Sequence, residues 1–598
     1  MNEPRTHYFK VRLSLTRLST EHPDTLEFSM PVWTPGSYLV RDFAKNVRGV
    51  RAYDTDSSRS LKVTKKDKST WAVHCSSVSS LSFEYEIYAF EPTVDTSYLD
   101  QRHAVVNGAS VFVYPVGMTN QPSILRVIRH EPWNVISTGL KMVSSDSKSW
   151  SFEVPDYDIL IDSPIEIGTQ EVHTFVEGET RYEVSIFNPF TFDSAQLVED
   201  LKKIVHHSAA VFRLVPFERY VFLVDVTSDS SGGLEHLNST LCMYSYLSTR
   251  SDTEHRRSLG LFSHEFFHAW NVKRMRPEGL GPFDYSREVY TRSLWVAEGL
   301  TSYYGELLLR RSNILSVEEY LDSLCDSINQ MISLPGSRWQ SAEEGSFDSW
   351  IKHYRRNETD PNSQLSYYTQ GTVIGALLDL QIRRNTRCAK TLDDVMREVY
   401  KGTYAEKAAG YTEEEFQKVC EEIGGEGISE IFERRVRGRD LVDYSRYLSY
   451  AGLKLSPKKK PSEVTGFLGL RAASDAGRVV AREILEGSAA EEAGIAPDDE
   501  IIAVDKLRVD LPRFSYLIKA AKAGVGLGLT VSRKGVLIDL RATVADYPAL
   551  ENRIIKTETA TQEQKSVYSS WIGAEWDTAL NYQEHLESPV RRRAFDFI

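Results

Sequence analysis

Two histidines, His264 and His268, stand four residues apart in "LFSHEFFHAWNVKRMRP", and Glu265 directly follows the first. On an α-helix, residues four apart lie one turn above each other on the same face, so both imidazoles can hold one metal ion. Zinc in hydrolases keeps three protein ligands and one water, whose pKa it lowers to near neutral. Glu265 stands where a carboxylate can accept that water's proton. The stretch predicts a hydrolytic zinc site, and the alternative is a helix that carries two histidines without a metal.

A third ligand is available in "LWVAEGLTSYYGE", where Glu298 stands 30 residues after His268. Its neighbours Trp295, Val296 and Leu300 are apolar, and an ionisable side chain in such surroundings needs a partner. A metal ion would supply that partner. The alternative for Glu298 is a carboxylate on a solvated helix face.

The stretch "SGGLEH" comes shortly after a predicted strand, "RYVFLVDV", Arg219–Val226. Gly232 and Gly233 would let another part of the chain approach closely, and Glu235 then stands where it could meet a cation. An ordinary turn after the strand is the alternative. His236 is left outside the zinc site, because neighbouring side chains on a strand point in opposite directions.

Two tyrosines, Tyr367 and Tyr368, directly precede a predicted helix that is rich in small residues, "TQGTVIGALLDL". A tyrosine hydroxyl that points at a metal site could stabilise a developing oxyanion. The alternative is that both rings only pack in the core.

The first part of the chain has the period-two pattern of β-strands. Phe9, Val11, Leu13 and Leu15 alternate with polar residues, and the same pattern recurs in "LSFEYEIYAF". Such alternation indicates strands with one buried face, so we predict a β-sandwich-like domain over residues 1–165. Strands followed by a mostly helical region predict a second, α+β domain over residues 166–455.

The last quarter of the chain divides into smaller segments. "SPKKKPSE", residues 456–463, is polar and carries two prolines, which indicates a solvated linker. A compact segment follows over residues 464–547, and a polar extension with a helix near "QEQKSVYSSWIGAEW" occupies residues 548–598. The predicted fold is therefore multidomain α+β.

Composition excludes some functions. The chain has 598 residues, too many for one core, and its formal net charge of -13 argues against a nucleic-acid binder. The five cysteines are scattered and form no C-x-x-C pair, which argues against a disulfide framework or a thiolate zinc site. No apolar leader or membrane span is seen, so the expected location is cytoplasmic, although a periplasmic form trimmed of its leader would look the same.

"HEFFHAWNVKRMRP", "LWVAEGLTSYYGE", "SGGLEH" and "YYTQG" together resemble the glycyl aminopeptidases, which are gluzincin metallopeptidases distantly related to the aminopeptidase N-like enzymes. "MPVWTPGSYLVRDFAKNV" and "TSYLDQRHAVVNGASVF" look like the N-terminal β domain of that family. The segment 464–547, with "GFLGL" and "GSAAEEAGIAPDDEIIAVD", looks like a PDZ domain of bacterial proteases. The resemblance implies a thermolysin-like zincin fold for the catalytic domain.

The resemblance also implies roles for individual residues. His264, His268 and Glu298 would hold one Zn²⁺ per chain, with Glu265 as general base. Glu235, with Gly232 and Gly233, would bind the free α-amine of a substrate. Tyr368 would stabilise the transition state, with Tyr367 as the alternative if the register differs by one. In the PDZ-like segment, the carboxylate loop would consist of Gly466, Phe467, Leu468 and Gly469. In one departure, the position four residues after Glu298 holds Ser302 instead of an aspartate, so the group that orients the ligand histidines is not identified.

Together these features predict a zinc aminopeptidase that removes N-terminal residues, Gly or Ala by the resemblance, from peptides with a free N-terminus. The strand Arg219–Val226 is expected to pair with the substrate backbone. One alternative is a zinc endopeptidase of the same fold, and another is an inactive PDZ-bearing scaffold that binds peptides. The PDZ-like segment either binds C-terminal peptides or only packs on the enzyme. The oligomeric state cannot be read from the sequence.

Overall fold

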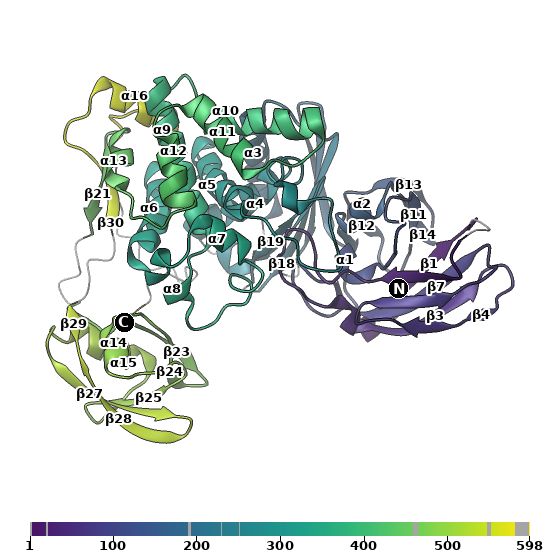
Figure 1. Cartoon of the computed structure of the whole chain (residues 1–598), viewed down its shortest axis with the longest axis horizontal. Coiled ribbons are helices and arrows are strands. Elements are labelled where there is room, and N and C mark those ends of the chain that lie inside the picture. Colours follow the sequence, from purple (N-terminus) through teal and green to yellow (C-terminus); the bar gives the residue numbers. More distant parts are fainter. Residues whose placement is uncertain are drawn as a thin grey trace. The chain divides into compact units, whose positions relative to one another are not determined.

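The computed structural model describes residues 3–18, 22–188, 190, 193–228, 230–249, 251–458, 465–546, 552–580 and 597. The chain forms two compact units, which are described in turn. The first unit is Met1–Thr291 with Met396–Thr412, and the second is Arg292–Val395 with Glu413–Ile598. Figure 1 labels their helices and strands.

The first unit begins with two small antiparallel sheets that pack face to face. Phe28 of one sheet stacks on Phe83 of the other, with ring centroids 4.4 Å apart, and both side chains are fully buried. The two sheets have the strand orders β1-β7-β3-β4 and β10-β2-β6-β5. Their strands are β1 Tyr8–Leu15, β2 Thr25–Ser29, β3 Val47–Asp54, β4 Ser60–Leu61, β5 Val63–Lys65, β6 Thr70–His74, β7 Leu81–Tyr88 and β10 Tyr114–Pro115. The predicted β-rich N-terminal domain is confirmed.

Two further sheets and several short helices complete this β region. The sheets have the orders β11-β14-β13 and β12-β15-β9-β8. Their strands are β8 Tyr98–Leu99, β9 Ala104–Val106, β11 Ser123–Ile128, β12 Val135–Thr138, β13 Lys141–Ser145, β14 Ser149–Val154 and β15 Ile165–Gly168. The helices are η1 Pro4–Thr6, η2 Phe43–Asn46, α1 Gly108–Val111 and α2 Tyr157–Ile161. Asp156 caps the start of α2, because its side chain accepts a hydrogen bond from the Ile159 N–H.

A mixed five-stranded sheet follows in the first unit, in the order β16-β17-β18-β20-β19. Its strands are β16 Glu171–Glu177, β17 Thr180–Phe187, β18 Arg219–Thr227, β19 Gly232–Glu235 and β20 Ser239–Ser245. The predicted strand at Arg219 is therefore confirmed as β18. The expectation that it pairs with substrate is wrong, because β17 and β20 already occupy both of its sides. The strand at the edge near the predicted site is β19.

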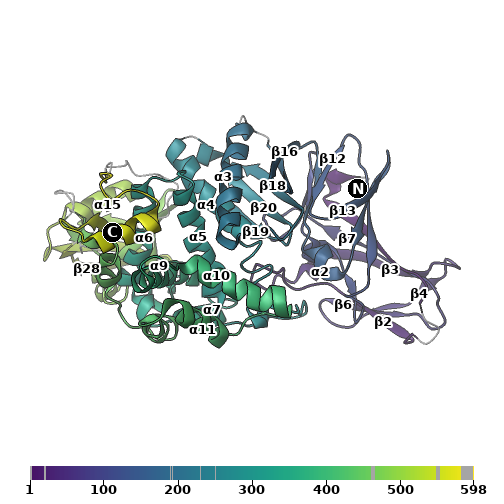
Figure 2. The same cartoon turned by 90° about the horizontal axis from the view of Figure 1, so that it is seen from above.

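Helices cover the sheet on one side, where Figure 2 shows α3 and α4 beside β18 and β20. The helices of this unit are α3 Ser194–Phe212, η3 Tyr246–Thr249, α4 Asp252–Phe267, η4 Glu278–Leu280 and η7 Lys401–Ala405. Phe222 and Phe266 join the sheet to α4, with ring centroids 5.5 Å apart. The buried aromatic layer fixes α4 against the strands.

The second unit is mostly helical and is built around α9, Tyr367–Thr386. Gly371 of α9 lies against Gly299, since a Cβ added to Gly371 would lie 2.6 Å from the Gly299 Cα. This contact lets two helices touch along their backbones. The other helices are η5 Trp295–Leu300, α5 Thr301–Arg311, α6 Val317–Ser333, η6 Pro335–Arg338, α7 Ala342–Phe347, α8 Asp360–Ser363, α11 Glu413–Gly424, α12 Ile428–Ile431, η8 Phe432–Val436 and α13 Tyr444–Ser449. Helix α10 Leu392–Tyr400 begins in this unit, and its residues from Met396 on belong to the first.

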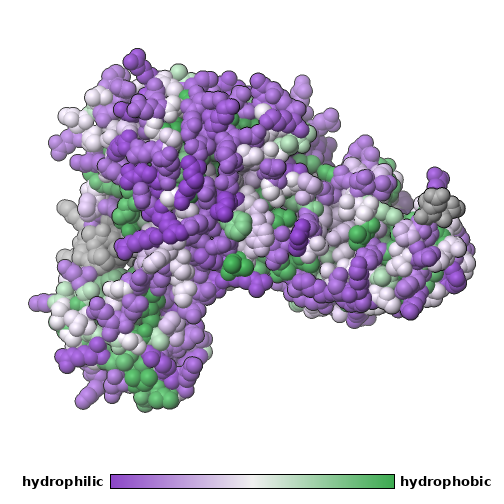
Figure 3. Space-filling view, viewed as in Figure 1, coloured by the Kyte–Doolittle hydropathy of each residue, from purple (hydrophilic) through white to green (hydrophobic). Residues whose placement is uncertain are grey.

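A β module is inserted between two paired strands of the second unit. β21 Leu453–Pro457 precedes the module and pairs with β30 Asn552–Lys556, which follows it. The module contains β22 Gly466–Phe467, β23 Leu470–Asp475, β24 Arg478–Ile484, β25 Glu500–Val504, β26 Leu507–Arg508, β27 Gly526–Arg533, β28 Val536–Thr543, β29 Ala545–Asp546, α14 Ala489–Glu492 and α15 Leu511–Ala520. It has its own core, which includes Leu470, Ile501 and Phe514. Hydrophobic residues are visible over β27 and β28 in Figure 3, where Val536 and Leu537 are exposed.

After the module the chain returns to the helices. α16 Gln562–Ile572 confirms the predicted C-terminal helix, and the Trp571 indole N–H donates to the Tyr303 hydroxyl at 2.9 Å. The predicted multidomain α+β class is confirmed. The domain boundaries stay predictions, and most of the linker 456–463, the first and last residues of the module 464–547, and much of the extension 548–598 lie outside the described residues. Within the described ranges, no helix is long and apolar enough to cross a membrane.

Candidate active site

The two predicted ligand histidines lie at the end of α4. Ser251 caps the start of this helix, since its hydroxyl accepts the Glu254 N–H at 3.2 Å. His264 and Glu265 lie in the last turn, and His268 is the C-terminal cap. The one-turn spacing expected from the sequence is confirmed.

The imidazoles of His264 and His268 converge. Their Nε2 atoms are 3.0 Å apart. Two nitrogens that share a tetrahedral zinc at the usual bond length would be separated by about 3.3 Å. The observed separation is close to this value, so the pair fits a zinc ion.

The second ring nitrogen of His268 contacts a group that orients the ring. The sequence alone did not identify this group. Its Nδ1 lies 2.7 Å from the main-chain oxygen of Asn271. A carbonyl oxygen can only accept, so Nδ1 carries the proton and Nε2 presents its lone pair. Carbonyl partners of this kind orient metal-binding histidines. The position of Asn271, three residues after a histidine that ends a helix, could have suggested this contact from the sequence.

Two carboxylates lie beside the histidines. The side chains of Glu235, Glu265 and His268 place one potential ligand atom each within 4.8 Å of one another, and their exposed fractions are 3%, 5% and 1%. Two buried carboxylates this close together call for a nearby cation, because a buried negative charge is costly without one. A metal ion or a substrate ammonium group would meet that need.

Gly233 explains how Glu265 reaches the sheet. A Cβ at Gly233 would lie 2.3 Å from Glu265 Oε1, whereas a Cβ at Gly232 would meet only Val94, at 3.9 Å. The two predicted glycines therefore differ, since Gly233 is required by the close approach of Glu265. Both lie on edge strand β19, which pairs with β20 in antiparallel register.

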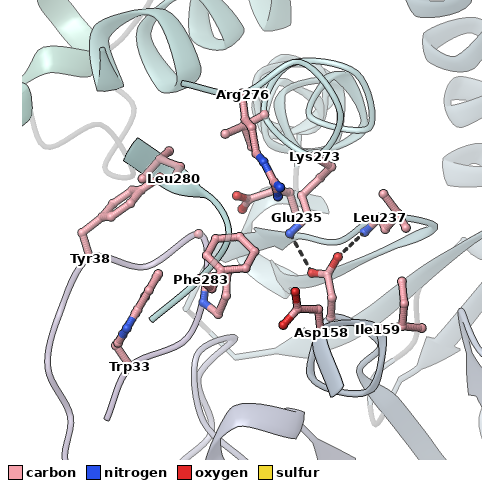
Figure 4. A pocket seen from close by; sticks show the side chains of 14 residues that line it. Trp33, Tyr38, Asp158, Ile159, Glu235, Leu237, Lys273, Arg276, Leu280 and Phe283 are labelled. Carbon is pink, nitrogen blue, oxygen red and sulfur yellow. Dashed lines mark hydrogen bonds and ion pairs between the residues drawn. The ribbon is translucent and has the colours of Figure 1, made fainter. Parts of the chain in front are cut away.

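Glu235 closes β19, and a loop of the N-terminal β region covers its carboxylate. A Cβ at Gly36 would lie 2.6 Å from Glu235 Oε2 and 2.8 Å from Oε1, and the φ angle of Gly36 is +93°. A pocket of about 110 Å³ adjoins Glu235. Figure 4 shows Glu235, Lys273 and Arg276 lining it together with Trp33 and Tyr38. The separation of Gly36 and Glu235 in the sequence left no signal of this contact.

His236 takes no part in this cluster. It is buried, and its Nδ1 lies 3.1 Å from Asp162 Oδ1. Burial lowers the pKa of His236 below its usual value. It therefore serves as a neutral partner of Asp162, as expected for a residue outside the zinc site.

The remaining predicted site residues lie in the second unit. Glu298 is on η5 and is 2% exposed. Tyr367 and Tyr368 begin α9, where the Ser366 hydroxyl accepts the Tyr368 N–H at 3.2 Å. Tyr367 is fully buried. Burial and the Glu298 carboxylate raise the pKa of Tyr368 well above its usual value.

His353 is a neighbour of these tyrosines that the sequence did not suggest. Its ring centroid lies 4.9 Å from that of Tyr367 and 5.4 Å from that of Tyr368. Burial lowers the pKa of His353 to about 4, so the ring is neutral. Its stretch, "WIKHYRRNE", is polar and gave no sign of a half-buried histidine packed on the tyrosines.

The predicted carboxylate loop of the module is tightly held. Gly466 and Phe467 form β22, which pairs with β29. The Leu468 carbonyl accepts the Ala490 N–H at 2.8 Å. Gly469 has a φ of +77°, and a Cβ there would lie 2.4 Å from the Cβ of Ser488. The loop therefore has one defined backbone path.

Two family models match the chain. The N-terminal domain of peptidase M61 matches residues 1–169, and M61 glycyl aminopeptidase matches residues 257–374, which includes the C-terminal part of α4 and Glu298. The chain therefore contains an N-terminal domain of the peptidase M61 type and an M61 glycyl aminopeptidase domain. It is therefore an enzyme, a metallopeptidase, as the sequence predicted.

Several solved structures are similar to the chain. A crystal structure of an aminopeptidase N family protein from Idiomarina loihiensis is 26% identical, with a TM-score of 0.89, and the match covers 95% of this chain and 98% of that one. Yeast LTA4 hydrolase in complex with bestatin is 14% identical over 76% of this chain and 66% of that chain, with a TM-score of 0.44. An M1 zinc metallopeptidase from Deinococcus radiodurans is 12% identical over 73% and 90%, with a TM-score of 0.45. No curated protein matches the chain.

Proposed function

We propose that this M61 peptidase is a zinc-dependent aminopeptidase that removes N-terminal residues from peptides. The observation that carries the proposal is the convergence of His264 and His268 at 3.0 Å beside the Glu235 and Glu265 carboxylates. Imidazole nitrogens and a neighbouring carboxylate are the donor set that catalytic zinc takes in peptidases. The family match supports the same class of activity.

One zinc ion per chain is proposed, with His264, His268 and Glu298 as ligands. The Nε2 separation and the Nδ1 contact of His268 support the two histidines. Support for Glu298 comes from its position in the matched family domain and from its burial in the apolar helix η5. Zinc, when bound there, polarises the scissile carbonyl and lowers the pKa of a water to near neutral.

Glu265 and a tyrosine have separate roles in the proposed reaction. Glu265 accepts the proton of the attacking water and passes it to the departing amine. Tyr368 donates a hydrogen bond to the oxyanion that forms on the carbonyl oxygen. For Tyr368, support comes from its raised pKa, which keeps the phenol protonated as a donor at neutral pH, and from the Glu298 charge that contributes to the shift. Tyr367 is the alternative donor.

Glu235 is proposed to bind the free α-ammonium group of the substrate, which restricts cleavage to the first peptide bond. Its buried carboxylate near His268 and Glu265 supports this role. Strand β19 lies at the edge of the sheet, and Gly232 and Gly233 carry no side chains that would obstruct it. It can therefore pair with an extended substrate. The family name supports a preference for N-terminal Gly, and the resemblance extends it to Ala.

The β module is proposed to be a PDZ domain that binds C-terminal peptides through the loop Gly466 to Gly469. Its independent core and the fixed backbone of the loop support this proposal. A purely structural module is the alternative, and titration of the full chain with a fluorescent peptide and its C-terminally amidated analogue separates the two. A cytoplasmic location is part of the proposal, and the five unbridged cysteines are compatible with it.

The decisive test of the enzyme proposal uses Glu265→Gln. This variant should retain zinc while kcat falls about 10²- to 10⁴-fold, the usual contribution of a general base. Glu298→Gln should instead lower the zinc content of the purified protein. Wild-type turnover in Glu265→Gln would contradict the role of Glu265 as general base. A wild type that binds zinc but hydrolyses no Gly- or Ala-reporter would favour the inactive peptide-binding scaffold.

A further inference from the structure

Asp162 is a buried carboxylate of the N-terminal β region that holds the end of strand β19. It directly follows α2, and two of its three donors belong to the residues after Glu235. The Leu237 main-chain N–H donates to Oδ2 at 2.9 Å, and His236 Nδ1 lies 3.1 Å from Oδ1. The turn that follows Glu235 is thus fixed from outside the sheet.

The third donor, Lys273, joins Asp162 to the end of helix α4, where His268 lies. Lys273 Nζ donates to Asp162 Oδ1 at 2.7 Å. The main-chain N–H of Lys273 donates in turn to the His268 carbonyl at 3.1 Å. Asp162 therefore connects the Glu235 strand to His268. It binds the Leu237 N–H on one side and Lys273 on the other, and Lys273 in turn binds the His268 carbonyl.

Charge makes this connection specific to a carboxylate. The Lys273 side chain is only 6% exposed, so its ammonium group needs a negative partner. Burial opposes the ionisation of Asp162, but the Lys273 charge and the hydrogen bonds from His236 and Lys273 together outweigh it and hold the pKa of Asp162 below its usual value. A neutral side chain at this position would keep hydrogen-bond acceptors but would leave a buried cation without compensation.

We propose that Asp162 is the positioning residue of Glu235. By fixing the Glu235–Leu237 backbone against His268, it keeps the Glu235 carboxylate at the distance from the histidines at which a substrate ammonium group fits. The N-terminal β region would then set the selection of free N-termini by the peptidase domain. This inference rests on the proposed aminopeptidase function.

The test compares Asp162→Asn with the matched control Asp158→Asn. Both carboxylates belong to the same short stretch, but the side-chain hydrogen bond that Asp158 accepts comes from the Tyr285 hydroxyl and not from the residues after Glu235. The measured quantities are kcat and KM of the full-length zinc enzyme for a glycyl reporter and for its N-acetylated analogue. Zinc content and thermal melting are recorded for each variant.

Asp162→Asn should raise KM for the free-amine reporter about 10- to 100-fold, the effect of a misplaced hydrogen bond to a charged group, with kcat and zinc content nearly unchanged. The preference over the acetylated reporter should fall by the same factor. Asp158→Asn should retain the preference. In the Glu235→Ala background, Asp162→Asn should change KM less than twofold, because it acts through the missing carboxylate.

Equal effects of Asp162→Asn in the wild-type and Glu235→Ala backgrounds, or an equal loss of preference in Asp158→Asn, would overturn the inference. If Glu235→Ala itself retained the preference, the proposed amine site would fail instead. Should Asp162→Asn not fold, Asp162→Asn/Lys273→Met removes the uncompensated cation. The same KM shift and the same dependence on Glu235 are expected of it, and their absence would also overturn the inference.

Discussion

Gly233 of β19 and Glu265 of α4 lie in direct contact, so that a methyl group at Gly233 would sit 2.3 Å from Glu265 Oε1 and 2.4 Å from its Cγ. No side chain fits in this space. The glycine therefore sets where the proposed general base stands relative to the substrate-binding edge of the sheet.

Gly233→Ala should displace the Glu265 carboxylate without touching His264 or His268. We expect kcat to fall about 100-fold, since a shift of about 1 Å in a reacting group has such an effect. Zinc content should remain that of the wild type. Steady-state kinetics with a glycyl reporter and metal analysis of the same preparation measure both quantities.

Gly232→Ala is the matched control for this prediction, because its added methyl would meet only Val94 at 3.9 Å. Because Glu265 is not displaced, kcat of Gly232→Ala should fall far less than kcat of Gly233→Ala. Equal activity of the two alanine variants would show that the contact between Gly233 and Glu265 does not position the base.

Gly36→Ala should disturb Glu235 from the opposite side, because its methyl would lie within 2.8 Å of both carboxylate oxygens. The expected result is a rise in KM for free-amine substrates of about 10-fold or more, as for the loss of a charge-assisted hydrogen bond. Turnover of an N-acetylated substrate should change much less. The ratio of kcat/KM for the two substrates is the measurement.

Gly117→Ala controls for backbone strain in that experiment. Gly117 also has a positive φ, +80°, and nothing lies within 4 Å of its added Cβ. Both variants bear a similar conformational penalty, so a difference between them reports on Glu235. If Gly117→Ala lost the same selectivity, strain would explain the effect.

Local patterns in the sequence predicted much of this protein. The spacing of His264 and His268 required only a helix, and the alternation around Phe83 required only a strand with one buried face. These features depend on residues within a few turns or strand repeats. The helices and the β-rich N-terminal region followed from such patterns.

Features that depend on distant pairing could not be predicted. The period-two pattern of β18 could not show that β17 and β20 occupy both its sides, so its expected pairing with substrate was wrong. The contact of Gly36 with Glu235 and the bond of Asp162 to Leu237 join residues from different domains of the sequence. The packing of His353 on Tyr368 spans less of the chain but also follows from no local pattern.

Stability should depend on pH through Glu166, a fully buried carboxyl group on β15. Burial raises its pKa to about 8, and the Ser185 hydroxyl donates to its Oε2 at 2.7 Å. The folded protein then holds a proton that the unfolded chain releases above about pH 4.3. The contribution of Glu166 to the free energy of unfolding is therefore complete at low pH. It is lost as pH rises towards 8, by at most about 1.4 kcal/mol per pH unit.

Glu166→Gln imitates the protonated form, so the melting temperature of the variant should decline less than that of the wild type between pH 5 and pH 8. His103 contributes in the same direction, because burial opposes its charge but Asp100 and Asp225 raise its pKa to about 9. Glu153→Gln, at an exposed position, is the control. Parallel melting curves of wild type and Glu166→Gln would contradict the assignment.

The most direct test of the aminopeptidase proposal is the ratio of kcat/KM for a glycyl reporter to that for its N-acetylated analogue, in the wild type and in Glu235→Ala. Glu235 lies within reach of Glu265 and His268, and a buried carboxylate paired with an ammonium group contributes strongly to binding. The wild-type ratio should be large and should fall about 100-fold or more in Glu235→Ala, as expected for truncating one partner of such a pair. Equal losses on both substrates would contradict the aminopeptidase proposal and favour an endopeptidase.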